Sequence, residues 1–256
     1  MEDITIKEKL EALKKKYRFH VPDRGDLDDE TISWRNGKPD YTLANYTFLM
    51  GKTQNHTEGS LEMVVEDLVK QWEMQASHFL DFSQWSTIEH GDYVVKVNGD
   101  PEMDGEEVSK NGNYNFLLSS CPVYKKLGKL SFDESHKVFR EAFPTGFPWE
   151  VLKVFSGPPE VVFSWRHWAN FEGIYGENKG KGELVEMFGI IRCVLSDQLK
   201  IRKIEVFYDP DTFLKVMEGE LKPEDLAGGK AIFGNTTETA IEKIDKKEEG
   251  FGCSIL

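Results

Sequence analysis

Two histidines and a carboxylate occupy positions from which they could transfer protons. His167 and Glu186 lie in neighbouring predicted strands, and His136 lies in a predicted helix. An imidazole with its ordinary pKa of about 6.5 can take up and return a proton at neutral pH, as an isomerisation or a dehydration requires. We therefore treat His167 as a candidate catalytic acid and base, and Glu186 as the residue that orients or complements it.

The residue before His167 limits this interpretation. Arg166 and His167 are consecutive in a predicted strand, so only one of them can point into a cavity on one face of the sheet. In the alternative, Arg166 pairs with Glu186 across the sheet and His167 donates to a backbone carbonyl, because buried polar groups usually find partners. The sequence leaves both interpretations open.

His136 lies on the same helical face as Phe132, Phe139 and Phe143, which directs it inward. One interpretation makes it a core histidine whose hydrogen bonds are satisfied within the fold. The other makes it part of a cavity wall, where it contacts a ligand or takes part in catalysis.

Two carboxylates are further candidates. Glu73 follows Trp72 in a predicted helix, and a carboxylate that faces a hydrophobic cavity has a raised pKa and can serve as a general base. A solvated or ion-paired position on that helix would have no such role. Asp209 follows Tyr208 at the end of the last predicted strand, where it is either a catalytic carboxylate or the N-cap of a final helix.

The charge balance argues against nucleic acid as a partner. The chain has 45 acidic and 32 basic residues and a net charge of −13, so its average surface repels phosphate backbones. It has neither a close cysteine pair nor a His-x-x-x-His motif, so we expect no metal site and no cofactor. Three widely spaced cysteines and an N-terminus without a signal-peptide core predict a cytoplasmic protein.

The elements that must position these residues follow one another along the chain: the predicted helices come first and the predicted strands come after them. A helix is expected from its N-cap Ser60 to about His78, and the capping box that begins at Ser131 opens another, which ends before Pro144. From Trp149 the pattern has period two and predicts consecutive antiparallel strands, separated by turns. The predicted strands are Glu150–Phe155, Val161–Ala169, Glu183–Leu195 and Lys200–Tyr208.

This order of elements predicts the α+β class and a single main domain. We expect residues 1–56 to form an arm with a short helix that wraps around the body, with the part from Val21 to Met50 extended. Residues 57–218 form the predicted domain, in which a short strand is expected at Tyr93–Val97. The polar segment Asp92–Asn113 is expected to be a surface excursion, and Asp211–Met217 a closing helix. Residues 219–256 are charged and low in large apolar side chains, which predicts a flexible tail.

Several motifs between residue 30 and residue 217 resemble the pathogen-related proteins of plants and fungi. This family is a branch of the superfamily of nuclear transport factor two, ketosteroid isomerase and SnoaL-type polyketide cyclases. The motifs are Trp34-Arg35-Asn36-Gly37-Lys38-Pro39-Asp40-Tyr41, Leu68-Val69-Lys70-Gln71-Trp72-Glu73-Met74, Ser135-His136-Lys137, Phe143-Pro144-Thr145-Gly146-Phe147, Ser156-Gly157-Pro158-Pro159, Arg166-His167-Trp168 and Gly182-Glu183-Leu184-Val185-Glu186-Met187-Phe188-Gly189-Ile190.

The resemblance implies a cone, in which a strongly curved antiparallel sheet and its covering helices enclose a mainly apolar cavity. It also implies an apolar small-molecule ligand and allows a homodimer through the convex face of the sheet. The first functional hypothesis is a cofactor-independent lyase, isomerase or cyclase; the alternative is a non-catalytic binding protein of a stress or defence response. Candidate ligand contacts are Trp72, Glu73, Trp165, Arg166, Trp168 and Tyr208.

The last four residues, Cys253-Ser254-Ile255-Leu256, fit the box that directs prenylation of the cysteine, with terminal Leu favouring geranylgeranyl. The lysines upstream alternate with acidic residues, so a polybasic second signal is missing. A single lipid chain gives only reversible membrane affinity. The box therefore predicts at most a reversible membrane association through Cys253.

Overall fold

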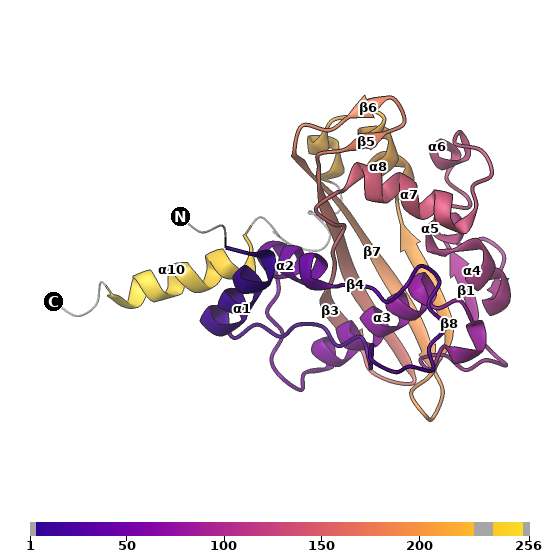
Figure 1. The fold of residues 1–256 in the computed structure, drawn as a ribbon, viewed down its shortest axis with the longest axis horizontal. Helices are drawn as coiled ribbons and strands as arrows, with labels where there is room; N and C mark the ends of the chain where they lie inside the picture. The colour runs from indigo at the N-terminus through magenta and orange to yellow at the C-terminus, as the bar shows by residue number, and fades with distance from the viewer. Residues whose placement is uncertain (1–3, 228–237, 253–256) are drawn as a thin grey trace.

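The computed structural model describes residues 4–227 and 238–252 and confirms the α+β class (Figure 1). Its α-helices are α1 (Ile6–Tyr17), α2 (Thr42–Gly51), α3 (Leu61–His78), α4 (Gly105–Asn111), α5 (Asn113–Leu117), α6 (Pro122–Lys125), α7 (Phe132–Ala142), α8 (Pro210–Met217) and α10 (Ala240–Gly252). The strands are β1 (Val94–Val97), β2 (Met103–Asp104), β3 (Trp149–Ser156), β4 (Glu160–Phe171), β5 (Ile174–Tyr175), β6 (Asn178–Lys179), β7 (Glu183–Leu195) and β8 (Ile201–Tyr208).

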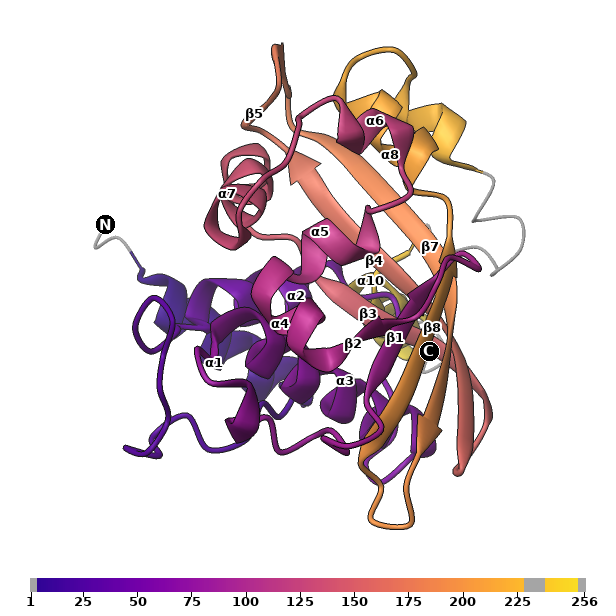
Figure 2. The same ribbon diagram turned by 90° about the vertical axis from the view of Figure 1, so that its right-hand side faces the viewer.

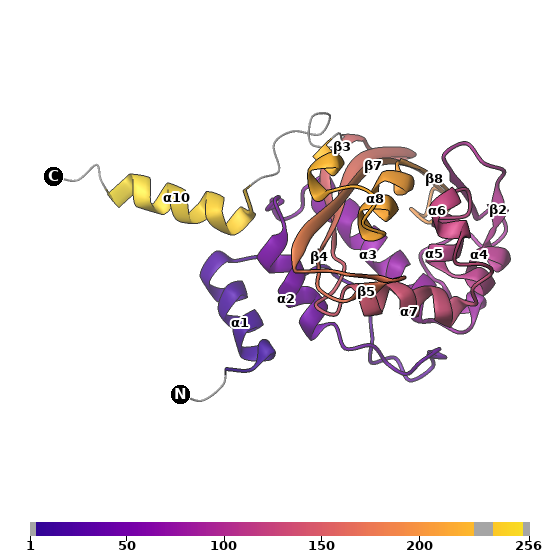
Figure 3. The same cartoon turned by 90° about the horizontal axis from the view of Figure 1, so that it is seen from above.

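The main sheet has the strand order β2-β1-β8-β7-β4-β3. Strands β3, β4, β7 and β8 pair antiparallel in chain order, which confirms the predicted meander, and β1 joins β8 in parallel. The sheet curves around α3, which lies within its concave side (Figure 3). The predicted curved sheet with helices on one face is therefore present.

The helix α3 follows from its sequence. Ser60 accepts a hydrogen bond from the Met63 backbone, which caps the helix, and the helix ends at His78 as predicted. Val65, Trp72 and Ala76 are buried against the sheet. Polar residues on the same side of α3 therefore lie between the helix and the sheet.

The helix α7 is opened by the predicted capping box, because Ser131 and Glu134 satisfy each other's backbone N–H groups. It packs against α5, and the two helices cover the end of the concave face that α3 leaves open (Figure 2). Gly112, just before α5, has φ +84° and lies so close to Phe132 that a Cβ would be 2.8 Å from that ring. Glycine is therefore required where α5 meets α7.

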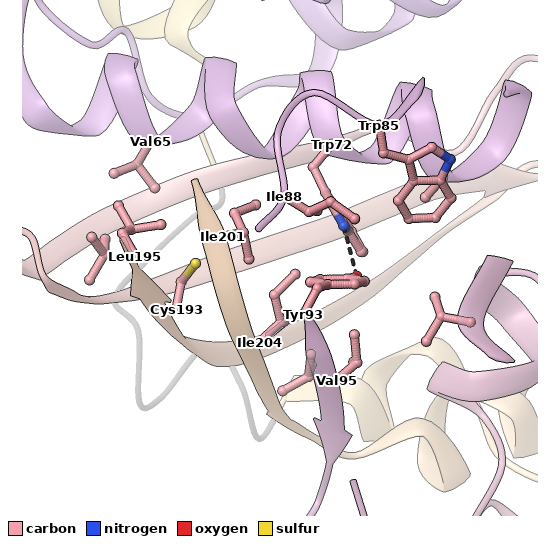
Figure 4. Packing of buried hydrophobic residues seen from close by; sticks show 14 of the residues in the cluster. Val65, Trp72, Trp85, Ile88, Tyr93, Val95, Cys193, Leu195, Ile201 and Ile204 are labelled. Carbon is pink, nitrogen blue, oxygen red and sulfur yellow. Dashed lines mark hydrogen bonds between the residues drawn. The ribbon is translucent and has the colours of Figure 1, made fainter. Parts of the chain in front are cut away.

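One part of the concave side is a solid core. Figure 4 shows Trp72 of α3 donating a hydrogen bond of 2.9 Å to the hydroxyl of Tyr93, which packs beside Ile204. Cys193 lies in the same cluster, and its burial raises the pKa of its thiol to about 12. As predicted, Cys193 is a buried apolar residue and not a nucleophile.

Two predictions about loops are wrong. The segment Val21–Met50 is not extended throughout, since α2 begins at Thr42 and buries Phe48 and Leu49. The segment Asp92–Asn113 contains the predicted short strand as β1, but it also contains β2 and α4, and Val108 of α4 is 1% exposed. Both segments contain many polar residues, so their short helices were not recognised from the sequence. Tertiary packing of a few apolar side chains stabilises these helices.

Part of the predicted tail forms the helix α10. Ala240 is buried in a cluster with Leu10, Phe48 and Trp168. The hydroxyl of Tyr17 also donates to Asp245 over 3.0 Å. The division of the chain into arm, domain and tail stays a prediction, but residues 240–248 of the tail pack against the arm.

Candidate functional site

A cavity of about 400 Å³ lies between the concave face of the sheet and the helices α3, α5 and α7. Its volume is in the range of pockets that hold small organic molecules. The sheet contributes mostly apolar side chains to the wall, including Phe163, Trp165, Met187, Ile191 and Val206. The polar lining comes mainly from the helices.

His167 lines this cavity, as the first of the two interpretations required. The centroid of its ring lies 3.5 Å from the centroid of the Phe147 ring. Burial, with a smaller effect from the charge of Lys70, lowers the pKa of His167 to about 3. The imidazole is therefore neutral at physiological pH, and it is a far weaker base than an ordinary histidine.

Arg166, Glu186 and Trp168 lie on the other face of the sheet. The Nε of Arg166 donates to Glu186 over 2.7 Å, and its Nη1 donates to Glu150 over 2.8 Å. The guanidinium lies 4.3 Å from the ring of Trp168. This geometry corrects two expectations: Glu186 does not orient His167, and neither Arg166 nor Trp168 contacts a ligand in this cavity.

Polar groups gather at the end of the cavity formed by α3, α5 and α7. His136 donates through Nδ1 to the backbone oxygen of Phe132 over 2.8 Å, if that nitrogen carries the proton, and its ring stacks on Phe132. Glu73, His78 and Arg140 line the same cavity. His136 on α7 therefore faces inward, as predicted, and Glu73 also lies at the cavity.

Burial lowers the pKa of both His78 and His136 below the ordinary histidine value. His78 packs edge-on against Tyr41 with ring centroids 5.8 Å apart. It was not predicted as a site residue. Its spacing of five residues from Glu73 places it about 140° around α3 from that side chain, so the helical spacing gave no signal for it.

Lys70 is another cavity residue that was not predicted. It precedes Glu73 by three residues on α3, so both side chains lie on one face of the helix. Lys70 lines the cavity and is 5% exposed. A lysine in the middle of a helix is most often solvated, so the sequence alone favoured that ordinary interpretation.

Several polar atoms of the cavity wall have no hydrogen-bond partner within the part of the chain that the structure describes. They are Nε2 of His136, Nδ1 of His167, Nε1 of Trp165 and Oδ1 of Asn113. A buried polar atom without a partner costs about 1–3 kcal/mol, so native proteins seldom leave several together. Their residues line the cavity, but the four atoms themselves are buried, so small side-chain movements would be needed before they could bond to a molecule inside it.

The remaining candidates divide between the cavity and the surface. Trp72, Trp165 and Tyr208 line the cavity, and the Tyr208 hydroxyl donates to the backbone oxygen of Leu117 over 2.7 Å. Asp209 is exposed and accepts a hydrogen bond from the backbone of Thr212, so it is the N-cap of α8. This corrects the expectation that Asp209 could be catalytic.

Cys253, the predicted lipidation site, lies outside the described residues. Among residues 4–227 and 238–252, no group of three or more His, Cys, Asp and Glu side chains is placed to hold a metal ion. Within the same ranges, every helix is too short or too polar to cross a lipid bilayer.

Fold and cavity together define an α+β protein with a curved sheet over a mainly apolar cavity. The chain is 34% identical over 206 residues to the pathogen-related protein of Hordeum vulgare, a match that covers 78% of this chain and 86% of the barley protein. The chain belongs to the family of pathogen-related proteins. No family model matches it.

Solved structures with a similar arrangement include two from bacteria. A proposed SnoaL-like polyketide cyclase from Jannaschia sp. CCS1 is 12% identical and aligns over 64% of this chain and 96% of its own, with a TM-score of 0.36. A proposed polyketide cyclase from Streptomyces antibioticus is 15% identical and aligns over 60% of this chain and 96% of its own, with a TM-score of 0.37.

Proposed function

We propose that this protein binds a mainly apolar small molecule that carries hydrogen-bonding groups, inside the cavity between α3 and the sheet. The observation that carries the proposal is a cavity of about 400 Å³ whose wall is mostly apolar and also includes the polar side chains of His136, His167 and Asn113. Each hydrogen bond between a ligand and one of these side chains would stabilise the complex by about 0.5–1.5 kcal/mol. The apolar remainder would be held by burial against the sheet.

Ligand binding can be tested with 2-naphthol, a fluorescent bicyclic alcohol that fits the cavity volume and offers one hydroxyl group. Ile191 lines the cavity, whereas Ile190 points to the other face of β7. Ile191→Trp should fill the cavity and weaken binding at least about tenfold, which is about 1.4 kcal/mol. Ile190→Trp, the matched control, should bind 2-naphthol as the unchanged protein does.

Equal binding by the two variants would overturn the proposal, provided that circular dichroism shows both to be folded. Native mass spectrometry of the protein from its own cells gives an independent check. A bound molecule that is lost from Ile191→Trp and retained by Ile190→Trp would identify the class of ligand.

A second candidate function is cofactor-independent proton transfer, as in a lyase, isomerase or cyclase. The observation in its favour is the polar end of the cavity, where Glu73, His78, His136 and Arg140 lie together. A carboxylate beside neutral imidazoles in a desolvated site can take a proton from carbon next to a carbonyl group. With a pKa of about 3, His167 is better suited to donate or accept a hydrogen bond than to take that proton.

Catalysis can be tested with 2-tetralone, a bicyclic ketone whose α-protons exchange slowly in D₂O. The protein should accelerate this exchange, and Glu73→Gln should reduce the rate at least about 100-fold, within the range of a lost general base. His136→Gln should reduce it less, because the imidazole orients or hydrogen-bonds the ketone. Exchange at the background rate, in a protein that binds 2-naphthol, would leave a binding protein without this activity.

Reversible membrane association through Cys253 and a cytoplasmic location are further proposals, which rest on the sequence box and on composition. The intact mass of the protein from eukaryotic cells tests the first. A geranylgeranyl adduct with loss of the last three residues supports it, and an unmodified C-terminus contradicts it.

A further inference from the structure

Lys70 places its amine in an unusual position for a lysine. The side chain is buried, and its Nζ lies 5.4 Å from the centre of the Trp149 ring and 5.2 Å from that of Phe48. Trp149 and Lys70 both line the cavity. The amine is therefore held at the edge of the cavity, between aromatic rings and away from bulk water.

No hydrogen bond or ion pair to the Lys70 amine is present within the described residues. Of the nearby carboxylates, Glu150 accepts from Arg166 and Glu66 accepts from the backbone of Val151. Glu73, whose charge acts most strongly on Lys70, is not within ion-pair distance of its amine. Buried lysines ordinarily pair with a carboxylate. A buried lysine without one keeps its amine available for a ligand.

The environment also favours the uncharged amine. Burial lowers the pKa of Lys70 to about 8. The negative charge of Glu73 partly opposes this shift, and the positive charge of Arg24 adds to it. An amine with this pKa is neutral in about a tenth of the molecules at pH 7, compared with less than about one in a thousand for a surface lysine. The neutral amine is the form that reacts with carbonyl groups.

We propose that Lys70 is a covalent site for carbonyl compounds, at which an apolar aldehyde or ketone bound in the cavity forms an imine. The Nζ lone pair attacks the carbonyl carbon, and one proton moves from nitrogen to oxygen to give a carbinolamine. Loss of the hydroxyl group and of the second N–H proton releases one water and leaves the C=N bond. No oxidant or cofactor is required, and the step is reversible by hydrolysis.

His167 is placed to assist this step. It lines the same cavity, and it is near enough for the Lys70 charge to contribute to its lowered pKa. Its Nδ1 has no partner among the described residues, and a neutral imidazole can both accept and donate a hydrogen bond. His167 would thus act as a positioning residue for the carbonyl oxygen or for the departing water. The inference depends on the cavity binding proposed above.

The test uses 2-naphthaldehyde with sodium cyanoborohydride at about pH 7, which converts an imine into a stable secondary amine. Peptide mapping should locate the adduct on Lys70, formed at least about 100-fold faster than on surface lysines, in line with the larger neutral fraction. Lys70→Met should abolish this fast labelling. His167→Phe should slow the labelling by a larger factor than it weakens 2-naphthol binding.

Lys52 is the matched control within the chain. It is also buried, and burial lowers its pKa as well, but it does not line the cavity. Fast labelling of Lys70 with slow labelling of Lys52 supports the proposal, whereas equal labelling of both would show that desolvation alone decides. Ile191→Trp should suppress the labelling of Lys70 together with the binding of 2-naphthol.

The two proposals can fail separately. If 2-naphthol binds to the unchanged protein and is lost from Ile191→Trp, but Lys70 is not labelled, the covalent site is overturned and the binding function stands. If neither 2-naphthol binding nor labelling occurs, both proposals fall. Labelling of Lys70 that persists at full rate in Ile191→Trp would show that the amine reacts without the cavity, which also overturns the inference.

Discussion

Arg166 and His167 are consecutive residues of β4 that lie in different environments on opposite faces of the sheet. Arg166 joins two buried carboxylates, Glu150 and Glu186, beneath α2, while His167 lines the cavity beneath α3. One of the pair therefore stabilises the fold, and the other faces the cavity. The two residues should respond to substitution in different ways.

Arg166→Met should destabilise the protein strongly. The substitution leaves Glu150 and Glu186 buried without their cation, and removal of one partner from a buried ion pair costs about 3–5 kcal/mol. Urea denaturation should show this loss in the free energy of unfolding. Because Arg166 lies on the face away from the cavity, 2-naphthol should bind to the folded fraction with unchanged affinity.

Arg192 provides the control for this loss. It also contacts two carboxylates, Glu160 and Glu205, but it is a third exposed at 33%. Arg192→Met should therefore lower the free energy of unfolding by no more than about 1 kcal/mol. If the two arginine variants lost stability equally, the buried network would not have the importance assigned to it.

His167 should make the fold sensitive to acid. Its pKa is about 3 in the folded state and about 6.5 in the unfolded state, so the unfolded chain binds more protons between these values. The stability is intact above pH 6.5 and falls as the pH decreases toward 3, by up to about 1.4 kcal/mol per unit. Between pH 7 and pH 5 the loss attributable to His167 is about 2 kcal/mol.

His167→Phe keeps a planar ring and removes this titration. Denaturation of both proteins at several pH values should show a shallower acid loss in the variant by about that amount. His78 and His136 also have lowered pKa values, so some acid sensitivity will remain. Parallel pH profiles for the two proteins would mean that His167 is not buried as the structure places it.

The sequence predicted the sheet well because local patterns specify it. Alternating apolar residues and turn residues defined β3, β4, β7 and β8 to within one or two residues at each end, and the meander followed from the short turns. The parallel pairing of β1 with β8 was not predicted, because it joins Val94–Val97 to residues more than a hundred positions later. No local signal carries that information.

The site was predicted only in part, for a related reason. The two-residue period of a strand shows that Arg166 and His167 point to opposite faces of the sheet, but not which of them faces the cavity. That choice depends on where α2 and α3 pack, since α2 covers Arg166 and α3 covers His167. Lys70 was missed because its burial results from the packing of α3 on β3 and not from its neighbours in sequence.

Gly189→Ala should distort the cavity. Gly189 pairs with Trp165 across β4 and β7, and an added Cβ would lie 2.5 Å from Cζ2 of that ring and 2.6 Å from the backbone oxygen of Phe207. Such overpacking costs about 1–3 kcal/mol and pushes Trp165 toward the cavity. Thermal unfolding should report the first effect, and weaker 2-naphthol binding the second.

Gly91 is the matched position for this change, since an added Cβ there meets nothing within 4 Å and its φ is not positive. Gly91→Ala should leave both stability and binding within measurement error of the unchanged protein. A Gly189→Ala variant that behaved in the same way would show that the Trp165 ring does not lie over Gly189.

Ala240→Asp should detach α10 from the body. Ala240 is buried among Leu10, Phe48 and Trp168, and its backbone N–H donates to the carbonyl oxygen of Lys52 over 2.8 Å. Burial of a carboxylate among these apolar side chains is costly, so undocking of the helix should be favoured over burial of the charge. Hydrogen exchange should then become faster along residues 240–252 and in α1.

The exchange of the sheet should be unchanged in that variant, and so should 2-naphthol binding, because the cavity lies on the other face. Lys247→Asp, at an exposed position of α10, controls for the added negative charge and should alter neither. If α10 exchanged equally fast in the unchanged protein and in Ala240→Asp, the helix would not be docked in solution.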